Sequence, residues 1–396
     1  MKFTFYLIVT MALFSACQPA QQSSVHTQAL VIDTHTDTPM QLINNGFDLG
    51  KRNRAPESRV DYPRLREGEV DAIFFALFTS QRKRTPENYE KAYRLVHQMI
   101  DSTLQSVSLN SEMVQLAKNA EDVEIISEQN KTAIYFGMEN GFPLASDLSR
   151  IEEFYNEGVR YITLCHSSNN DICDSSTDPV GTEHNGVSEF GEAVISEMNR
   201  LGMMIDVSHI SDSSFFDVMR LSKAPVIASH SSVRAICNHP RNLNDEMIQA
   251  LAKNGGVIQI CILGNYIRNA DTTSINYLKH EELRKKYNNF QYASEEERKA
   301  AWEQWDAIER DFPPELPAIS EAVDHIDHVV KLVGIDYVGI GSDFDGGGGL
   351  SDCADVADFP KITEELIRRG YNQKQINKIW GGNFLRVFKA VETMAQ

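Results

Sequence analysis

Histidine and acidic side chains stand at or near the ends of six separate apolar runs in this chain of 396 residues. In chain order these side chains are His35 with Asp37, Glu139, His166, His209, His230 and Asp343. Imidazole and carboxylate groups, without a thiolate among them, are ligands that suit Zn²⁺, Mn²⁺ and similar ions. A fold that brings these run ends together would therefore build a metal centre.

The spacing of these residues predicts two neighbouring cation sites. His35 and Asp37 lie two positions apart in extended chain, so both side chains point to the same side and can bind one ion. His209 and His230 follow adjacent runs and can bind a second ion, and Glu139 has two carboxylate oxygens with which to bridge them. Two cations about 3.5–4 Å apart form the centre of many hydrolases, because they turn a shared water into hydroxide at neutral pH.

Asp343 follows the last of the apolar runs and has a different expected role. Its carboxylate would orient the attacking hydroxide and then carry the proton to the leaving group. For any single histidine or acid at a strand end, a hydrogen-bonded wall residue is the simpler interpretation. The prediction of a hydrolytic centre therefore rests on the whole set of residues.

Eight short apolar runs alternate with helical patterns and supply the elements that would position this set. The runs are Ala29–Asp33, Val70–Phe78, Thr132–Glu139, Val159–His166, Gly202–His209, Pro225–His230, Gly256–Ile262 and Tyr337–Asp343. Near-continuous apolar strands fit a parallel sheet with both faces covered, and amphipathic segments such as Glu189–Leu201 and Asn244–Lys253 fit the covering helices. The pattern predicts a (β/α)₈ TIM barrel, in which the carboxyl ends of all strands meet at one face.

A doubly wound open sheet is the alternative architecture, but it usually has fewer strands and often a glycine-rich first turn that this sequence lacks. Two other motifs are not assigned to the site. His325 and His328 fall in the charged helical stretch 321–332, where a solvated helix surface is favoured over a metal site. Gly346–Gly349 lacks the context of a phosphate-binding loop, and we expect a flexible loop near the mouth of the site.

The composition is that of a globular protein and excludes several functions. Hydrophobic residues make up 42% and charged residues 24% of the sequence, and the net charge is −18. A chain with this negative net charge does not attract nucleic acid or anionic lipid surfaces, so we expect no nucleic-acid partner. The cysteines after residue 17 show no regular spacing, and we expect buried free thiols rather than disulfides. They are Cys165, Cys173, Cys237, Cys261 and Cys353.

The N-terminal segment is predicted to be an export signal rather than part of the fold. Lys2 precedes an apolar run, residues 3–14, that is too short to span a bilayer and is typical of a secretory signal. Ser15-Ala16-Cys17 is similar to the lipobox of bacterial lipoproteins, in which the cysteine is acylated; a plain secreted protein is the alternative. We predict a signal peptide at 1–16, a tether at 17–28 anchored through Cys17, and a barrel domain at 29–396. The expected location is the bacterial cell envelope, facing the periplasm or the exterior.

Seven motifs occur in order along the chain between residues 31 and 388. They are VIDTHTD (31–37), GMENG (137–141), LCHSSNN (164–170), GMMIDVSH (202–209), PVIASHSSVRAICNHPRN (225–242), VGIGSDFDG (338–346) and GGNFLRVF (381–388). With these motifs the chain resembles the membrane dipeptidase (renal dipeptidase) family of metallopeptidases, which have barrels of the amidohydrolase type. The resemblance implies that His35 and Asp37 bind one zinc ion, that His209 and His230 bind a second, and that Glu139 bridges the two.

The same resemblance implies roles for three further residues. His166 corresponds to a histidine that faces the substrate and helps to polarise its carbonyl group. Arg241 corresponds to an arginine that binds the terminal carboxylate of the substrate, although the sequence alone favours a surface position for it. Asp343 corresponds to the aspartate that handles the proton.

The implied function is a zinc-dependent dipeptidase that hydrolyses L,L and also L,D dipeptides through a hydroxide between the metals. A different di-metal amidohydrolase, acting on N-acyl amino acids or lactams, is the alternative. Such enzymes usually bridge their metals through a carboxylated lysine in strand four, and residues 159–166 contain no lysine. A non-catalytic peptide-binding lipoprotein is disfavoured because no metal position is substituted. Dipeptides and, through the lipid anchor only, a membrane are the expected partners, and the choice between a monomer and a homodimer is left open.

The segment from 268 to 317 departs from the family pattern. Mammalian members have a short connection after strand seven, whereas this chain has a long charged segment there that predicts one or two helices. Because it follows a strand, the insertion begins at the active-site face. A lid, a partner-contact element and a solvated helical decoration are the three interpretations that the sequence leaves open.

Overall fold

The computed structural model describes residues 25–43, 47–53, 58–290 and 294–395, and in them one parallel sheet has nine strands. The strands are β1 (Ile32–Thr36), β2 (Ala72–Phe78), β3 (Val114–Leu116), β4 (Thr132–Glu139), β5 (Val159–Thr163), β6 (Met204–Asp206), β7 (Ile227–Ser231), β8 (Val257–Cys261) and β9 (Val338–Gly341). Eight of them follow the order β1-β2-β4-β5-β6-β7-β8-β9, and β3 pairs with β4 outside this path.

Contacts between β1 and the end of β9 close the sheet into a barrel. Thr36 forms a parallel bridge with Phe344. The Asp37 amide donates to the Phe344 carbonyl at 2.9 Å, and the Asp343 amide donates to the His35 carbonyl at 3.0 Å. The predicted (β/α)₈ barrel is therefore confirmed, and the carboxyl ends of its strands share one face.

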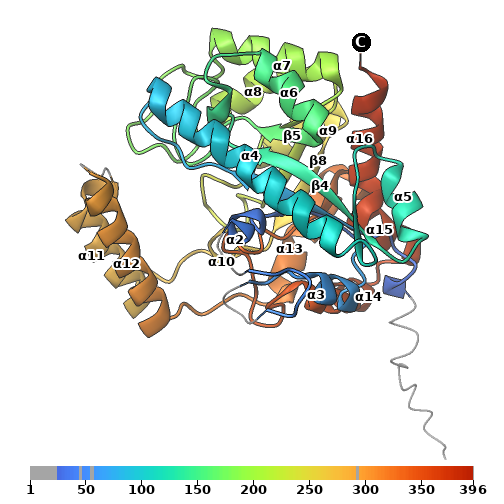
Figure 1. Ribbon diagram of the computed structural model, residues 1–396. Helices are drawn as coiled ribbons and strands as arrows, with labels where there is room; N and C mark the ends of the chain where they lie inside the picture. The colour runs from blue at the N-terminus through green and yellow to red at the C-terminus, as the bar shows by residue number, and fades with distance from the viewer. Residues whose placement is uncertain (1–24, 44–46, 54–57, 291–293, 396) are drawn as a thin grey trace, which may run out of the picture.

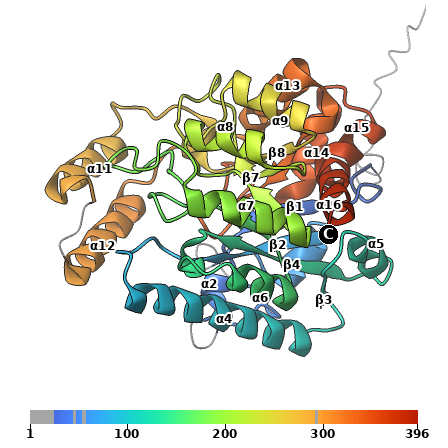
Figure 2. The same cartoon turned by 90° about the horizontal axis from the view of Figure 1, so that it is seen from above.

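Helices surround the barrel (Figures 1 and 2). They are α2 (Pro39–Leu42), α3 (Tyr62–Glu67), α4 (Pro86–Leu109), α5 (Asp122–Ser127), α6 (Ser149–Glu157), α7 (Glu189–Leu201), α8 (Asp212–Leu221), α9 (Asp245–Asn254), α10 (Gly264–Ile267), α11 (Ile275–Lys286), α12 (Glu295–Asp311), α13 (Ile319–Val333), α14 (Phe359–Arg368), α15 (Gln373–Asn377) and α16 (Asn383–Thr393). The side chains of Ser188 and Asn244 accept backbone N–H groups where α7 and α9 begin. Gly202 and Gly255 end the same two helices with φ angles of 72° and 83°, a conformation that favours glycine.

Aromatic side chains fill the inside of the barrel. The Phe74 ring stacks on Tyr135 at 4.7 Å and on Tyr161 at 5.6 Å between ring centroids. From α16, Phe384 and Phe388 meet Phe74 edge to face. The first residues of β1, β2, β6, β7 and β8 belong to the same buried cluster. Helix α16 therefore covers the amino ends of the strands, opposite the face where the predicted site lies.

The strand ends differ from the prediction by a few residues. β1 runs on to Thr36, so His35 lies inside the strand, whereas β5 and β6 end at Thr163 and Asp206, before His166 and His209 are reached. β3 is missing from the prediction because it has only three residues and pairs along one side only. The expectation for the five cysteines after residue 17 is confirmed, since all are buried free thiols.

The prediction of a solvated surface position is wrong for His325. Its ring is fully buried, with Nδ1 accepting the Val233 amide at 3.0 Å and Nε2 donating to the Ile267 carbonyl at 3.0 Å. Burial lowers the pKa of His325 to about 4, so the ring is neutral. The charged pattern around His325 did not reveal that α10 and the loop after β7 cover this side of α13. His328 is half-buried and pairs with Asp245 at 2.7 Å.

Helices α11 and α12 occupy the predicted insertion and form a hairpin. Leu283, Tyr287 and Ala301 make a small apolar cluster of their own between the two helices, and the rings of His280 and Trp305 lie 4.0 Å apart. The hairpin stands off from the barrel in both views (Figures 1 and 2). No helix in the described ranges is both long enough and apolar enough to cross a membrane.

Candidate metal centre

The predicted site residues come together at the carboxyl end of the barrel. His35 lies in β1, Glu139 is the last residue of β4, and His230 lies in β7. His166, His209 and Asp343 follow β5, β6 and β9 within three residues. Both His209 and Asp343 adopt positive φ angles, 72° and 60°, which are uncommon for side-chain-bearing residues and concentrate at functional sites.

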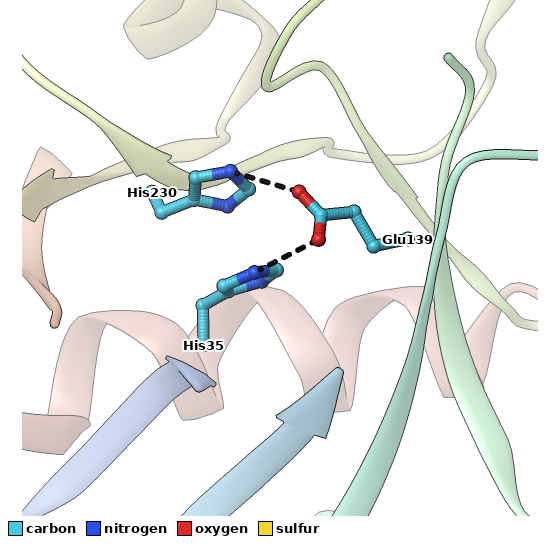
Figure 3. Close-up of side chains that lie close together, drawn as sticks. All are labelled: His35, Glu139 and His230. Carbon is cyan, nitrogen blue, oxygen red and sulfur yellow. Dashed lines mark ion pairs between the residues drawn. The ribbon is translucent and has the colours of Figure 1, made fainter. Parts of the chain in front are cut away.

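The two oxygens of Glu139 face different histidines (Figure 3). Oε2 lies 3.5 Å from His35 Nε2. Oε1 lies 3.0 Å from His209 Nε2 and 3.4 Å from His230 Nε2, and 3.7 Å from His166 Nε2. This division is the arrangement that a carboxylate bridging two cations requires.

Two further carboxylates complete the side of the centre that His35 faces. Ligand atoms of His35, Asp37 and Asp343 all lie within 4.8 Å of one another. Gly346 makes this approach possible, because a Cβ atom there would lie 2.0 Å from an Asp37 oxygen and 2.3 Å from an Asp343 oxygen. The glycine run after β9 thus lies against the site, and Asp345 holds it by accepting the Arg59 amide at 2.6 Å.

Crowding of buried charges perturbs the acidic side of the centre. Burial, reinforced by the charge of Glu139, raises the pKa of Asp37 well above its ordinary value. Burial also opposes the charged form of Glu139, but the charge of His35 and the contacts with the surrounding histidines outweigh it and hold the Glu139 pKa well below its ordinary value. At His35 burial opposes the positive charge, yet Glu139 raises the pKa to about 10. The site therefore attracts positive charge between its carboxylates.

The other three histidines are neutral at neutral pH. Burial lowers the pKa of His166 to about 4. Burial, followed by the charge of Arg241, lowers the pKa of His209, and burial followed by the charge of His35 lowers that of His230. A neutral imidazole has a free lone pair, which is the form that binds a metal ion.

These residues fit a pair of divalent cations. His35 Nε2 is buried and has no hydrogen-bond partner, while the Nε2 atoms of His209 and His230 face each other at 2.8 Å. Nitrogen atoms that converge in this way need a shared proton or a cation between them. Three neutral imidazoles and three carboxylates without a thiolate are ligands that suit zinc and similar ions.

Arg241 lies beside the centre and not on the surface that the sequence alone favours. It is only 3% exposed, and its guanidinium donates to the His230 carbonyl at 3.0 Å and lies 5.2 Å above the Tyr266 ring. Its Nε atom is buried without a hydrogen-bond partner. Among the described residues no carboxylate lies within ion-pair distance of it, so the buried cation is available to an anionic ligand.

Three further residues lie behind the centre and are not among the predicted site residues. Tyr161, Asp206 and Ser229 are buried and contact the outer nitrogens of the histidines or each other. The available signal was a polar residue inside an otherwise apolar strand, above all the aspartate of β6. A further group, His97 with Glu153 and Glu157, lies between α4 and α6, apart from this centre.

Comparisons with known proteins agree with this geometry. A profile of the membrane dipeptidase family, peptidase family M19, matches residues 19–396. The chain is 31% identical to Dipeptidase 3 of Macaca fascicularis over 92% of its own length and 66% of that protein. It is also 31% identical to Dipeptidase ataJ of Aspergillus terreus, over 92% of this chain and 85% of the relative.

Solved structures show the same fold. The probable dipeptidase PvdM from Pseudomonas aeruginosa superposes with a TM-score of 0.86 at 30% identity, covering 95% of this chain and 98% of that one. A metallopeptidase from Rhodobacter sphaeroides, liganded with a phosphinate mimic of the dipeptide L-Ala-D-Ala, has a TM-score of 0.75 at 21% identity and covers 92% of this chain and 99% of that one. The chain belongs to the membrane dipeptidase family of metallopeptidases.

Proposed function

We propose that this chain hydrolyses the peptide bond of dipeptides at the carboxyl end of its barrel. The observation that carries the proposal is a carboxylate, Glu139, between two groups of histidines, with the unpaired buried guanidinium of Arg241 beside them. A centre of this kind can hydrolyse an amide when it holds its metal ions. The buried guanidinium of Arg241 favours a substrate that carries a negative charge. The names of the relatives, Dipeptidase 3 and Dipeptidase ataJ, support the same activity.

Zinc is the metal that we propose, with two ions per chain. His35 and Asp37 would hold one ion, His209 and His230 the other, and Glu139 both. When bound, the cations would supply Lewis-acid polarisation of the peptide carbonyl and would lower the pKa of the attacking water. The support is the donor set, which offers imidazole and carboxylate groups on both sides of Glu139.

His166 would donate a hydrogen bond to the carbonyl oxygen of the substrate. Its side chain is 25% exposed, more than those of His209 and His230, and therefore lies nearest to the mouth. The Ser167 hydroxyl lies 2.9 Å from His166 Nδ1. A neutral ring whose Nδ1 accepts from that hydroxyl carries its proton on Nε2, the atom that faces the centre. Such a donor stabilises the negative charge that develops on the oxygen during attack.

Asp343 would move the proton. Its carboxylate lies close to Asp37 and His35, within reach of the position where water would attack. There it can accept the proton of that water and then deliver it to the amine nitrogen of the departing residue.

Arg241 would set the length of the substrate. Its guanidinium is held in place by the His230 carbonyl and the Tyr266 ring, so it cannot follow a longer peptide. We propose that a carboxylate bound there belongs to the residue that directly follows the cleaved bond. We propose that the substrates are L,L and L,D dipeptides, and the support for the second class is the family resemblance.

The test combines metal analysis of the purified chain with a panel of substrates. The panel contains L,L and L,D dipeptides, a tripeptide and an N-acyl amino acid, with Glu139→Gln as the inactive control. Two metal ions per chain and turnover of dipeptides alone are the expected results. Efficient cleavage of the tripeptide or of the N-acyl amino acid would contradict the proposal.

We further propose that Cys17 anchors the chain to the bacterial cell envelope, facing the periplasm or the exterior. The support is the sequence of residues 1–17, which lie outside the described residues. Residues 18–24 would then serve as the tether. The predicted tether end at residue 28 is too late, because His26 is buried in the barrel domain and its ring lies 2.6 Å from Thr363 Oγ1.

A further inference from the structure

The outer nitrogen of His35 is held by a hydroxyl whose own proton is used elsewhere. Tyr161 Oη lies 2.9 Å from His35 Nδ1 and donates its proton to the Thr34 carbonyl at 3.1 Å. A hydroxyl has one proton, so Tyr161 can only accept at the His35 contact. In its neutral form, the one that can bind a cation, His35 therefore carries its proton on Nδ1, which leaves the lone pair on Nε2, the buried atom that faces Glu139. We call this chain of hydrogen bonds, from His35 through Tyr161 to Thr34, a relay.

A second relay, through Ser229 to Asp206, lies behind His230. Ser229 Oγ lies 2.8 Å from His230 Nδ1 and donates its proton to Asp206 Oδ2 at 2.6 Å. Asp206 is surrounded by donors: the amides of Ser208 and Ser229 reach Oδ1 at 3.0 and 2.8 Å, and Thr163 Oγ1 reaches Oδ2 at 2.5 Å. With its proton committed to Asp206, Ser229 accepts from His230 Nδ1, and the His230 lone pair also lies on Nε2.

We propose that Tyr161 and the Ser229–Asp206 pair are positioning residues that set the proton on Nδ1 of His35 and His230. Both rings then present Nε2 lone pairs to the two oxygens of Glu139 (Figure 3). A histidine in the opposite tautomer would point an N–H group at the cation and could not bind it. The inference rests on the proposed metal centre and assigns three residues that support it without touching the substrate.

The packing around the relays is built to hold them. Gly137 leaves room for Tyr161, because a Cβ atom at this position of β4 would lie 2.0 Å from the tyrosine ring. Thr34 Oγ1 donates to the Ser229 carbonyl at 2.7 Å, which joins β1, the strand of His35, to β7, the strand of His230. The rings of His35 and His230 lie against each other, tilted by 31° with centroids 3.8 Å apart, so neither can turn without displacing the other.

The sharpest test moves the His230 proton from Nδ1 to Nε2 without changing the shape of the site. In Asp206→Asn the two backbone amides keep the amide oxygen at the Oδ1 position, which places the NH₂ group against Ser229 Oγ. Ser229 then accepts from the amide and donates to His230 Nδ1, so His230 takes its proton on Nε2. Ser229→Ala only removes the hydroxyl that accepts the hydrogen bond from His230 Nδ1. Thr163→Val is the matched control, because it removes one donor to Asp206 and leaves the direction of the relay unchanged.

The measurements are metal per chain, zinc affinity by competition with a chelator, and the visible spectrum of the cobalt-substituted protein. We expect Asp206→Asn to weaken the affinity by about 100-fold and Ser229→Ala by about 10-fold, in line with other partners of metal-bound histidines. Tyr161→Phe should also cost about 10-fold, whereas Tyr135→Phe, whose hydroxyl donates to the Asn119 carbonyl, should match the wild type. The cobalt spectrum should change in the three relay variants and in neither control.

The outcomes separate this inference from the proposed function. A wild-type chain that binds no divalent cation would overturn the proposed function together with this inference. A wild-type chain that binds two, with Ser229→Ala and Tyr161→Phe equal to their controls, would overturn this inference alone. Asp206→Asn keeps every heavy-atom position, whereas Ser229→Ala removes one. A lower zinc affinity in Asp206→Asn than in Ser229→Ala would therefore show a tautomer effect and not a loss of packing. A higher zinc affinity in Asp206→Asn than in Ser229→Ala would contradict the proposed move of the His230 proton from Nδ1 to Nε2.

Discussion

Glu139 and Arg241 bring opposite charges to the same buried end of the barrel, and in the described ranges no lysine or arginine pairs with Glu139 and no carboxylate pairs with Arg241. Glu139 is surrounded by histidines, and Arg241 contacts a backbone carbonyl, a hydroxyl and an aromatic ring. Isolated buried charges are costly unless a ligand compensates them. The two side chains thus define the two halves of a substrate position, one for the reacting bond and one for a carboxylate.

Replacement of Arg241 tests the second half. In Arg241→Ala we expect KM for dipeptides to rise roughly 10- to 100-fold, because a charge-assisted hydrogen bond to the substrate is lost. Steady-state kinetics on a dipeptide and on its C-terminal amide provide the measurement. For the wild type, KM should be higher for the amide than for the dipeptide by the same factor. For Arg241→Ala, KM should be equal for the two substrates. Arg220→Ala, an exposed arginine paired with Asp217, is the control; additive losses in the variant would contradict the assignment.

The residues of the centre were predictable because each stands where a strand ends. His35, Glu139 and His230 needed only the strand count and the rule that parallel strands share one carboxyl face. Arg241 was not predictable from pattern alone, because it comes from a loop and its guanidinium reaches the Ser231 hydroxyl and the His230 carbonyl only in the folded chain. The direction of the Tyr161 proton depends on atoms that only the folded chain brings together.

At the scale of elements, the helices differ in how firmly they are joined to the barrel. Helix α13 is attached by the buried His325, which joins it to the Val233 amide and the Ile267 carbonyl. The hairpin of α11 and α12 packs on its own apolar cluster. The strands themselves followed from the apolar runs, but the burial of His325 did not, because the helix pattern around it is charged and the covering loop is distant in sequence.

The attachment of α13 predicts a pH dependence of stability. The pKa of His325 is lowered to about 4 in the folded chain, so below its ordinary value of about 6.5 the unfolded chain takes up a proton that the folded chain does not. Its contribution to stability is full above pH 6.5 and falls as the pH drops towards 4. At pH 5 the loss is about 2 kcal/mol, or roughly 2–3 °C in Tm.

The difference between the wild type and His325→Gln isolates this effect, because the other buried histidines contribute to both chains. Thermal unfolding at pH 7 and pH 5 is the measurement. The wild type should lose more Tm than the variant on acidification, although it is the more stable of the two at pH 7. Equal acid shifts in the two chains would show that His325 does not titrate in this way.

Removal of the hairpin tests its role at the active-site face. Arg268 pairs with Glu315 at 3.5 Å and with Glu321, so the two ends of the insertion lie side by side. A short glycine-serine linker in place of residues 272–313 can therefore close the gap. Because the hairpin packs on itself, we expect the Tm of the barrel and kcat/KM for dipeptides to stay unchanged. A lower kcat/KM at unchanged Tm would instead make the hairpin a lid.

At the scale of the whole molecule, one barrel accounts for almost all of the described chain. Helix α16, near the C-terminus, covers the amino ends of the strands, and the site lies at the opposite end. The length of 396 residues alone would have suggested two or three domains. The strand count predicts one barrel, and the hairpin accounts for much of the additional length.

The proposed anchor is a property of the full chain and needs the full chain for its test. Expressed in a bacterium that processes lipoproteins, the wild type should fractionate with membranes and incorporate labelled palmitate. Cys17→Ser should do neither, while kcat/KM for dipeptides stays the same, because the substitution lies outside the barrel. Fractionation of the serine variant with membranes would contradict anchoring through Cys17.

The closure between β1 and β9 has a consequence for the time at which the site can form during synthesis. The Ser342 amide and hydroxyl donate to Asp33, which lies 309 positions earlier in the chain, and the neighbouring Asp343 amide donates to the His35 carbonyl. A nascent chain that has not yet released β9 from the ribosome lacks both the wall beside His35 and the Asp343 carboxylate. A prematurely terminated product would therefore carry all five proposed metal ligands but neither the closed barrel nor the proton-carrying Asp343.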